Sequence, residues 1–141
     1  MKLQQLLSFT RKAVDTYQMI QPGDKIAIGI SGGKDSSVCA ALCVKALGKE
    51  RVIGVMMPQG EQFDINYSKE LCEFLDIKNY TIDIKKAVDG VYDAIGDSFE
   101  VSNQTKFNLP ARIRMSVVYA VAQSNNGRVC NTCNLSEDWV G

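Results

Sequence analysis

Residues 29–37, with the sequence Gly-Ile-Ser-Gly-Gly-Lys-Asp-Ser-Ser, have the composition of a phosphate-binding loop. Glycines let the backbone approach a phosphate closely. The first amides of a helix have no internal partners, and the helix dipole adds partial positive charge there. Asp35 adds a carboxylate that can hold Mg²⁺ against the phosphates. The stretch therefore predicts an anion site between a strand and a helix.

Two common phosphate loops do not fit this stretch. A Walker A loop has four residues between its first glycine and Gly-Lys, and Ser or Thr follows. Here three residues separate Gly29 from Gly33-Lys34, and Asp35 follows. The fingerprint G-x-G-x-x-G is also absent. The remaining pattern, Ser-Gly-Gly-x-Asp-Ser, resembles the loop of the PP-loop ATP pyrophosphatases, which cleave ATP between its α- and β-phosphates. A glycine-rich turn without a ligand is the alternative.

The segments around the loop alternate between apolar runs and helical periods. An apolar run over 25–30 predicts a buried strand, and the pattern over 36–47 predicts a helix. The other elements predicted before residue 96 are a helix over 3–19, a strand over 51–57, a helix over 65–75 capped by Asp64, a strand over 80–84 and a weaker helix over 86–95.

The second part of the chain continues this alternation. Residues 96–107 are polar and predict a mobile loop near the ligand edge. Asn108 is predicted to cap a helix that has Pro110 in its first turn and extends to about residue 124. A strand is predicted to start at Arg128. Strands separated by helices of this length predict the α/β class, with a Rossmann-like open parallel sheet and helices on both faces.

Ligands of such a sheet bind outside the carboxyl ends of its strands. Three predicted strand ends meet there, at residues 31–33, 57–60 and 132–137. Backbone groups of 57–60 can wrap an adenine, and 132–137 offers a hydroxyl and a carboxylate. Glu137 is predicted to face Asp35 across one Mg²⁺, because oxygen ligands from two loops suit that ion. The alternative is that Glu137 is a solvated loop charge.

Two arginines near the start of the predicted helix are the other chemical signal. Arg112 and Arg114 lie two residues apart, so they point about 200° from each other around the helix axis. One can reach a ligand while the other reaches a carboxylate of the fold. Arginine at a helix start opposes the helix dipole, so stability alone does not favour this placement.

Composition limits the remaining possibilities. The chain has 141 residues, 45% of them hydrophobic, which fits one domain with a real core. Its 16 basic and 16 acidic residues cancel, which argues against nucleic acid and anionic membranes as partners. No apolar run approaches ~20 residues and no signal-peptide pattern is present, so a soluble, cytoplasmic protein is expected. Because the chain has no histidine, catalysis would rest on carboxylates, cations, amides and a metal ion.

The five cysteines, in a chain without an export signal, argue against a disulfide framework. Cys39 and Cys43 share one face of the predicted helix and are expected to be small core residues. Cys130 and Cys133 form a C-x-x-C, which is consistent with a redox pair, half a metal site or neither. Without histidine, a dedicated zinc site is disfavoured.

Four ordered motifs together resemble ammonia-dependent NAD⁺ synthetase, a PP-loop family with an adenine nucleotide alpha-hydrolase-like fold. The family pattern is Ser-Gly-Gly-x-Asp-Ser-Ser, an apolar-Pro pair, Asn-x-x-Ala-Arg-x-Arg-Met and Gly-Thr-x-Asn-x-Ser-Glu. This chain matches it at 31–37, 57–58, 108–115 and 131–137, in that order. Asn131 stands where the pattern has glycine. The resemblance covers nearly the whole chain, so 1–141 is interpreted as one domain of this family.

The resemblance also implies roles for individual residues. Asp35, Thr132 and Glu137 are the implied catalytic residues, and Asp35 and Glu137 the implied Mg²⁺ ligands. Asn108, Arg112 and Arg114 are the implied substrate-binding residues, with Arg112 contacting nicotinic acid adenine dinucleotide (deamido-NAD). The residues implied to bind ATP are Gly29, Ile30, Ser31, Gly32, Gly33, Lys34, Asp35, Ser36, Ser37 and Thr132.

The implied reaction has two steps. The nicotinate carboxylate attacks the α-phosphorus of ATP and expels pyrophosphate, and ammonia then attacks the acyl-adenylate to give NAD⁺ and AMP.

No glutamine-hydrolysing domain precedes the synthetase part, so free ammonia, or ammonia from a separate protein, is the expected nitrogen source. The family normally continues past Gly141 with further ATP and dinucleotide contacts and much of its homodimer interface. The chain is therefore expected to be truncated at its C-terminal end, as a fragment or a shortened paralogue, and to be a poor catalyst or none. A homodimer is expected for the complete protein.

Two other functions stay open at this point. Some PP-loop enzymes that thiolate tRNA combine Ser-Gly-Gly-Lys-Asp-Ser with a C-x-x-C, which Cys130 and Cys133 match. Zero net charge and the better match to Thr-x-Asn-x-Ser-Glu argue against that function. A non-catalytic nucleotide-binding remnant of the synthetase is the third hypothesis.

Overall fold

A computed structural model describes residues 2–61 and 65–132 of the chain. Its elements alternate as the sequence predicts. In chain order they are α1 (Leu3–Thr16), β1 (Lys25–Gly29), α2 (Lys34–Leu47), the short 3-10 helix η1 (Lys49–Arg51), β2 (Val52–Met56), α3 (Ile65–Leu75), β3 (Lys78–Thr81), α4 (Lys85–Ile95), α5 (Asn103–Ser124) and β4 (Gly127–Cys130). In the part of the chain described, no helix is long and apolar enough to cross a membrane.

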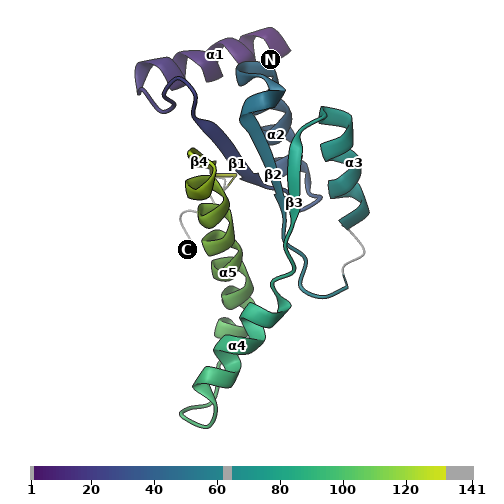
Figure 1. The fold of residues 1–141 in the computed structure, drawn as a ribbon, viewed down its shortest axis with the longest axis vertical. Coiled ribbons are helices and arrows are strands. Elements are labelled where there is room, and N and C mark those ends of the chain that lie inside the picture. Colours follow the sequence, from purple (N-terminus) through teal and green to yellow (C-terminus); the bar gives the residue numbers. More distant parts are fainter. Residues whose placement is uncertain (1, 62–64, 133–141) are drawn as a thin grey trace.

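The four strands form one parallel sheet in the order β3-β2-β1-β4 (Figure 1). β1 pairs with β2 from Ile26↔Val52 onward and with β4 from Lys25↔Gly127 onward. The chain adds β2 and β3 on one side of β1 and then returns to place β4 on the other side. This reversal makes the carboxyl end between β1 and β4 the topological switch point, where ligands of such sheets bind.

Helices cover both faces of the sheet, which confirms the predicted fold class (Figure 1). Side chains alternate between the two faces along each strand, so neighbours in sequence belong to different clusters. On β1, Ile28 packs in the cluster covered by α2 and α3, whereas Ala27 packs in the cluster covered by α5. The buried part of α5 consists of Val118, Val121 and Ala122.

Gly54, at the centre of β2, is a position where a side chain would not fit. A Cβ built there would lie 2.9 Å from Cys72 Sγ and 2.9 Å from Ile30 Cδ1. We expect Gly54→Ala to lower the free energy of unfolding by about 1–3 kcal/mol, the usual cost of overpacking.

Gly90→Ala is the matched control for this substitution. Gly90 lies in α4 and has nothing within 4 Å of an added Cβ. Alanine there should raise the free energy of unfolding by about 0.5–1 kcal/mol, because glycine loses more entropy in a helix. Urea unfolding tests whether Gly54→Ala lowers the free energy of unfolding and Gly90→Ala raises it. Equal free energies of unfolding for the two variants would contradict the packing described for β2.

The third strand was predicted over 80–84, and that assignment is wrong by two to three residues, since β3 spans Lys78–Thr81. Pairing with β2 decides the difference, because the ladder runs from Ile53↔Lys78 to Met56↔Thr81. The segment after β3 still follows the exit of β2. Ile82 N donates to Met56 O at 2.8 Å, and Ile84 N donates to Pro58 O at 2.8 Å.

The predicted start of the long helix is also wrong. Asn108 does not cap it, and Pro110 lies inside α5 rather than in its first turn. The helix begins earlier because Ser102 is its N-cap, with Ser102 Oγ accepting from Thr105 N at 3.2 Å. The predicted mobile loop is therefore shorter, and residues from Asn103 onward are helical.

Candidate functional site

A pocket of about 260 Å³ opens at the carboxyl ends of β1, β2 and β4. It lies at the switch point of the sheet, so its walls come from segments far apart in the sequence. The lining residues are Gly29, Ile30, Ser31, Ser36, Met57, Pro58, Ile65, Ser68, Arg114 and Thr132. All three strand ends expected to converge contribute to it.

The backbone between β1 and α2 turns at two glycines. Gly32 has φ +84°, in the left-handed region that favours glycine. Gly33 is the N-cap of α2 and has no side chain with which to cap the helix. The first turn of α2 therefore starts at Lys34 and presents amides that no N-cap side chain covers. The helix starts two residues before its predicted start, so Asp35 belongs to this turn.

Serine hydroxyls hold the turn in this shape. Ser36 is buried, and its Oγ accepts from Ser31 N at 3.3 Å and lies 3.1 Å from Ser31 Oγ. Ser31 Oγ in turn accepts from Gly33 N at 3.3 Å. Ser37 Oγ donates to Gly33 O at 2.7 Å. This network fixes the backbone before any ligand arrives, which reduces the entropy lost on binding.

The exit of β1 is anchored from two sides. Ile30 N donates to Val55 O at 2.9 Å, which extends the pairing with β2 by one bond. Ser68, buried on α3, donates through Oγ to Ile30 O at 3.4 Å. Ser68 was not among the residues predicted for the site. The sequence contained an indication of this position, because Ser68 has the helical spacing that places it on the same inward face of α3 as Ile65 and Cys72.

Of the two arginines on α5, Arg114 lines the pocket and Arg112 does not. Arg114 is half-buried, lines the pocket and donates through Nε to Met57 O at 2.9 Å. One of the two arginines was expected to reach a ligand and the other a carboxylate of the fold, and Arg114 lies at the pocket with this carbonyl as its hydrogen-bond partner. Arg112 is exposed and does not line the pocket. Its contact with a dinucleotide stays a prediction.

The loop after β2 is tied to the start of α4 through Asp83. Asp83 Oδ1 accepts from Gly60 N at 3.0 Å and from Lys85 N at 2.8 Å. These hydrogen bonds, the Gly60 bond first, lower the pKa of the Asp83 carboxyl below its ordinary value of 3.8. The carboxylate thereby holds the segment 57–60 beside the pocket.

Asp83→Asn should lower the melting temperature at neutral pH, because an uncharged amide oxygen replaces a carboxylate that accepts two backbone hydrogen bonds. The folded pKa is depressed, so the stabilisation is present above the ordinary pKa of 3.8 and is lost as the pH falls through the folded value. Thermal unfolding between pH 2 and 7 tests this sign. The deficit should vanish at the acid end, where the Asp83 carboxyl is protonated. A loss of melting temperature in Asp83→Asn that does not change with pH would contradict the stabilising role given to the Asp83 carboxylate.

The predicted site residues fall into four groups. Six of them line the pocket, and these are Gly29, Ile30, Ser31, Ser36, Arg114 and Thr132. Five belong to the adjoining turn and the first residues of α2 without lining it, and these are Gly32, Gly33, Lys34, Asp35 and Ser37. Asn108 and Arg112 lie on α5 away from the lining, and Glu137 lies outside the described residues.

Comparison with known proteins identifies relatives along almost the whole chain. The sequence model of the NAD synthase family matches residues 2–141. The NH(3)-dependent NAD(+) synthetase of Methanosarcina mazei is 40% identical over 119 residues, which are 82% of this chain and 46% of that protein.

Solved structures agree with this result. The NH3-dependent NAD synthetase of Campylobacter jejuni superposes with a TM-score of 0.83 at 28% identity, over 97% of this chain and 59% of that one. The NMN synthetase of Francisella tularensis superposes with a TM-score of 0.78 at 34% identity, over 95% of this chain and 54% of that one. The chain spans about half the length of the curated relatives it matches.

Proposed function

The chain belongs to the NAD synthase family, and from this membership we propose that it forms the ATP-binding part of an enzyme that amidates deamido-NAD to NAD⁺. Ammonia is the nitrogen donor, and ATP is converted to AMP and pyrophosphate. The observation that carries the proposal is the pocket at the switch point, with the serine-braced glycine turn and the uncapped start of α2 beside it.

The phosphates of ATP are proposed to bind at this turn. Backbone amides at the start of α2 and the helix dipole both favour an anion. Ser31, after β1, and Thr132, after β4, add hydroxyl groups to the lining of the pocket. At about 260 Å³ the pocket is slightly below the range of about 300–1,000 Å³ for small-molecule sites, so it suits part of a nucleotide. The adenine is proposed to lie along 57–60.

Mg²⁺ is proposed to bind with the phosphates. Among residues 2–61 and 65–132, no group of three His, Cys, Asp or Glu side chains forms an all-protein cage. Mg²⁺ does not need one, because it commonly keeps waters and binds through one or two carboxylates plus substrate phosphates. Asp35, exposed in the first turn of α2, fits that role, and Glu137 is the proposed second ligand. The bound ion would supply positive charge against the phosphate oxygens.

The work of the chain's own residues is alignment and neutralisation of charge. A carboxylate must approach the α-phosphorus of ATP, so two anions have to meet. The amides at the start of α2 and the half-buried Arg114 offset negative charge near the pocket. The hydroxyl of Thr132 is proposed to orient the phosphates. The acyl-adenylate then reacts with ammonia, and AMP leaves.

Partners and location follow the family. The complete protein is proposed to act as a homodimer in the cytoplasm on deamido-NAD, ATP and ammonia, without nucleic acid or membrane. Membership of the NAD synthase family favours this function over tRNA thiolation. A nucleotide-binding remnant differs from the synthetase only in lacking turnover.

A product assay tests the proposal. The protein is incubated with Mg-ATP, ammonium and deamido-NAD, and NAD⁺, AMP and pyrophosphate are measured together. Any NAD⁺ formed, in the small amount expected of a poor catalyst, should be matched by an equal amount of AMP, and no NAD⁺ should form without ammonium. ATP binding without products would support the remnant, and release of orthophosphate in place of pyrophosphate would contradict the proposed bond cleavage.

A parallel assay replaces deamido-NAD by nicotinic acid mononucleotide. The similarity to an NMN synthetase at 34% identity makes this comparison necessary. We expect the dinucleotide to be the better substrate, because curated relatives such as the two Methanosarcina proteins are NH(3)-dependent NAD(+) synthetases. A preference for the mononucleotide would contradict the proposed substrate but leave the ATP site unchanged.

A further inference from the structure

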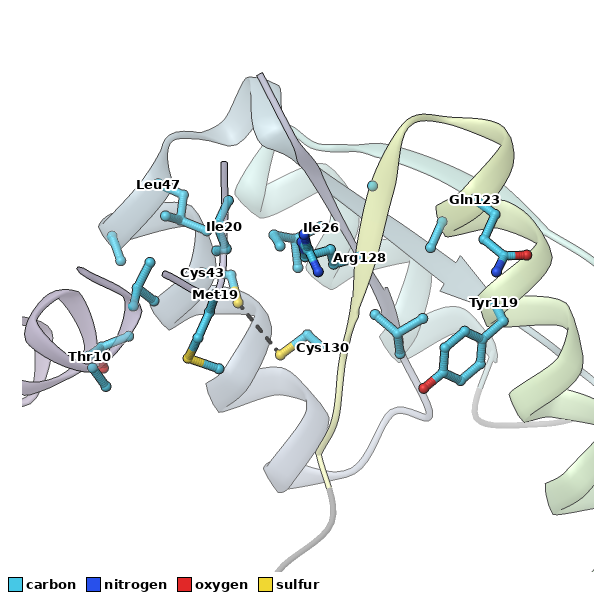
Figure 2. A pocket seen from close by; sticks show the side chains of 16 residues that line it. Thr10, Met19, Ile20, Ile26, Cys43, Leu47, Tyr119, Gln123, Arg128 and Cys130 are labelled. Carbon is cyan, nitrogen blue, oxygen red and sulfur yellow. Dashed lines mark hydrogen bonds between the residues drawn. The ribbon is translucent and has the colours of Figure 1, made fainter. Parts of the chain in front are cut away.

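A second pocket, of about 800 Å³, lies around β4 between α1, α2 and α5. Two cysteines from different elements meet in its wall (Figure 2). Cys43, on α2, donates through Sγ to Cys130 Sγ, on β4, at 3.8 Å. Both are half-buried and both line the pocket, so a small reagent that enters it can reach them.

Strand register explains why the two residues meet. Cys130 pairs with Ile28 in the β1–β4 ladder, and neighbours in register point to the same face of a sheet. Ile28 belongs to the cluster covered by α2, and both cysteines pack against that cluster. The pairing is therefore built by the fold between residues 87 positions apart.

We propose that Cys43 and Cys130 form a redox-active dithiol that low-molecular-weight disulfides oxidise to an intramolecular disulfide. This modification site is independent of the proposed synthetase reaction. It also differs from the C-x-x-C suggested by sequence, because Cys130 is paired across the fold.

The chemistry is a pair of thiol–disulfide exchanges. The thiolate of Cys130 attacks one sulfur of the reagent, which forms a mixed disulfide and expels one thiolate. Cys43 then loses its proton, attacks the Cys130 sulfur and expels the second thiolate. Two protein thiols are oxidised to one disulfide, and one reagent disulfide is reduced to two thiols.

The environment assigns these roles to the two sulfurs. The hydrogen bond donated by Cys43 lowers the pKa of Cys130 to about 7, although burial acts in the opposite direction. The same pairing, together with burial, raises the pKa of Cys43. Cys130 is therefore the first nucleophile, and Cys43 is the residue that resolves the mixed disulfide.

Closing the disulfide requires a small movement. The sulfur atoms are 3.8 Å apart, and a disulfide bond is about 2.05 Å long, so they must approach by about 1.8 Å. The open pocket beside them leaves room for rotation of the side chains.

Thiol mapping tests the proposal. The 141-residue chain is treated with oxidised glutathione, quenched in acid, alkylated with N-ethylmaleimide and examined by intact and peptide mass spectrometry. We expect two of its five thiols to escape alkylation and one cross-linked peptide to join Cys43 to Cys130. Five alkylated thiols, a Cys130–Cys133 link or a stable glutathione adduct on wild-type Cys130 would each overturn it.

Variants separate the pair from its neighbour on the helix. Cys43→Ser should prevent the link and leave glutathione on Cys130, whereas Cys130→Ser should give neither product. Cys39→Ser, one turn from Cys43 on the same helix, is the matched control and should form the link as wild type does. Loss of the link in Cys39→Ser would overturn the assignment. Far-UV circular dichroism checks the fold of each variant, and the wild-type map decides the question if one fails to fold.

Discussion

Replacement of Asp35 by Asn is expected to remove the dependence of ATP binding on Mg²⁺. The carboxylate is exposed in the first turn of α2, beside the turn proposed to hold the phosphates. Asparagine keeps the shape but loses the charge that an oxygen-ligated cation needs. In the wild type, Mg²⁺ should strengthen ATP binding measured by calorimetry, and in Asp35→Asn the affinities with Mg²⁺ and with EDTA should be equal. Turnover, where present, should fall by at least about 100-fold, the scale of losing one charge-stabilising group in an active site.

The control for this variant is Asp93→Asn, which makes the same charge change on α4. It should retain the wild-type response to Mg²⁺. Unfolding curves should show that both variants fold, because neither carboxylate is buried. An Asp35→Asn protein that still binds Mg-ATP more tightly than free ATP would remove Asp35 from the metal site.

Replacement of Arg114 by Ala is expected to affect stability and ATP binding together. Arg114 joins α5 to the loop after β2 through the hydrogen bond from its Nε to Met57 O. A hydrogen bond from a charged group contributes about 1.5–3 kcal/mol to stability, so the free energy of unfolding should fall by about that amount. ATP affinity should fall about tenfold or more, because the variant loses both a pocket cation and the anchor of the pocket wall.

Arg112→Ala is the matched control, two residues away on the same helix. The exposed Arg112 has no part in the pocket lining, so stability and ATP affinity should stay within error of the wild type. A loss confined to the affinity for deamido-NAD would agree with the role implied for Arg112 by the family resemblance. If Arg112→Ala weakened ATP binding more than Arg114→Ala did, the assignment of the two arginines would have to be exchanged.

Which of the two arginines faces the site could not be predicted from the sequence. Spacing alone correctly predicted that Arg112 and Arg114 point in different directions, but not which one faces the site. That choice depends on the rotation of α5 about its axis, which is set by packing of Val118, Val121 and Ala122 on the sheet. Such contacts are tertiary, so no local pattern contains them.

Features governed by local patterns were predicted well. The glycine turn, the alternation of strands and helices and the parallel sheet follow from residue type and periodicity. The segments 31–33 and 132–137 were expected to converge because parallel strands end at a common edge, and Ser31 and Thr132 from these segments both line the pocket.

Features set by competing local signals or by pairing were predicted less well. The helix α5 starts at the Ser102 cap, although Asn108 and Pro110 offered a similar signal further along. The ends of β3 depend on its ladder with β2, and the contact of Cys43 with Cys130 depends on the register of β4. The register of a strand is fixed by its partners rather than by its own sequence.

The turn between β1 and α2 is proposed to hold the phosphates of ATP. A crystal structure of the protein with Mg²⁺ and a non-hydrolysable ATP analogue would show whether they bind there. We expect the phosphates against the backbone amides of residues 32–36 and next to Ser31 and Thr132, with the adenine along residues 57–60. An analogue bound instead in the pocket around β4, with the turn empty at saturating concentration, would contradict the account.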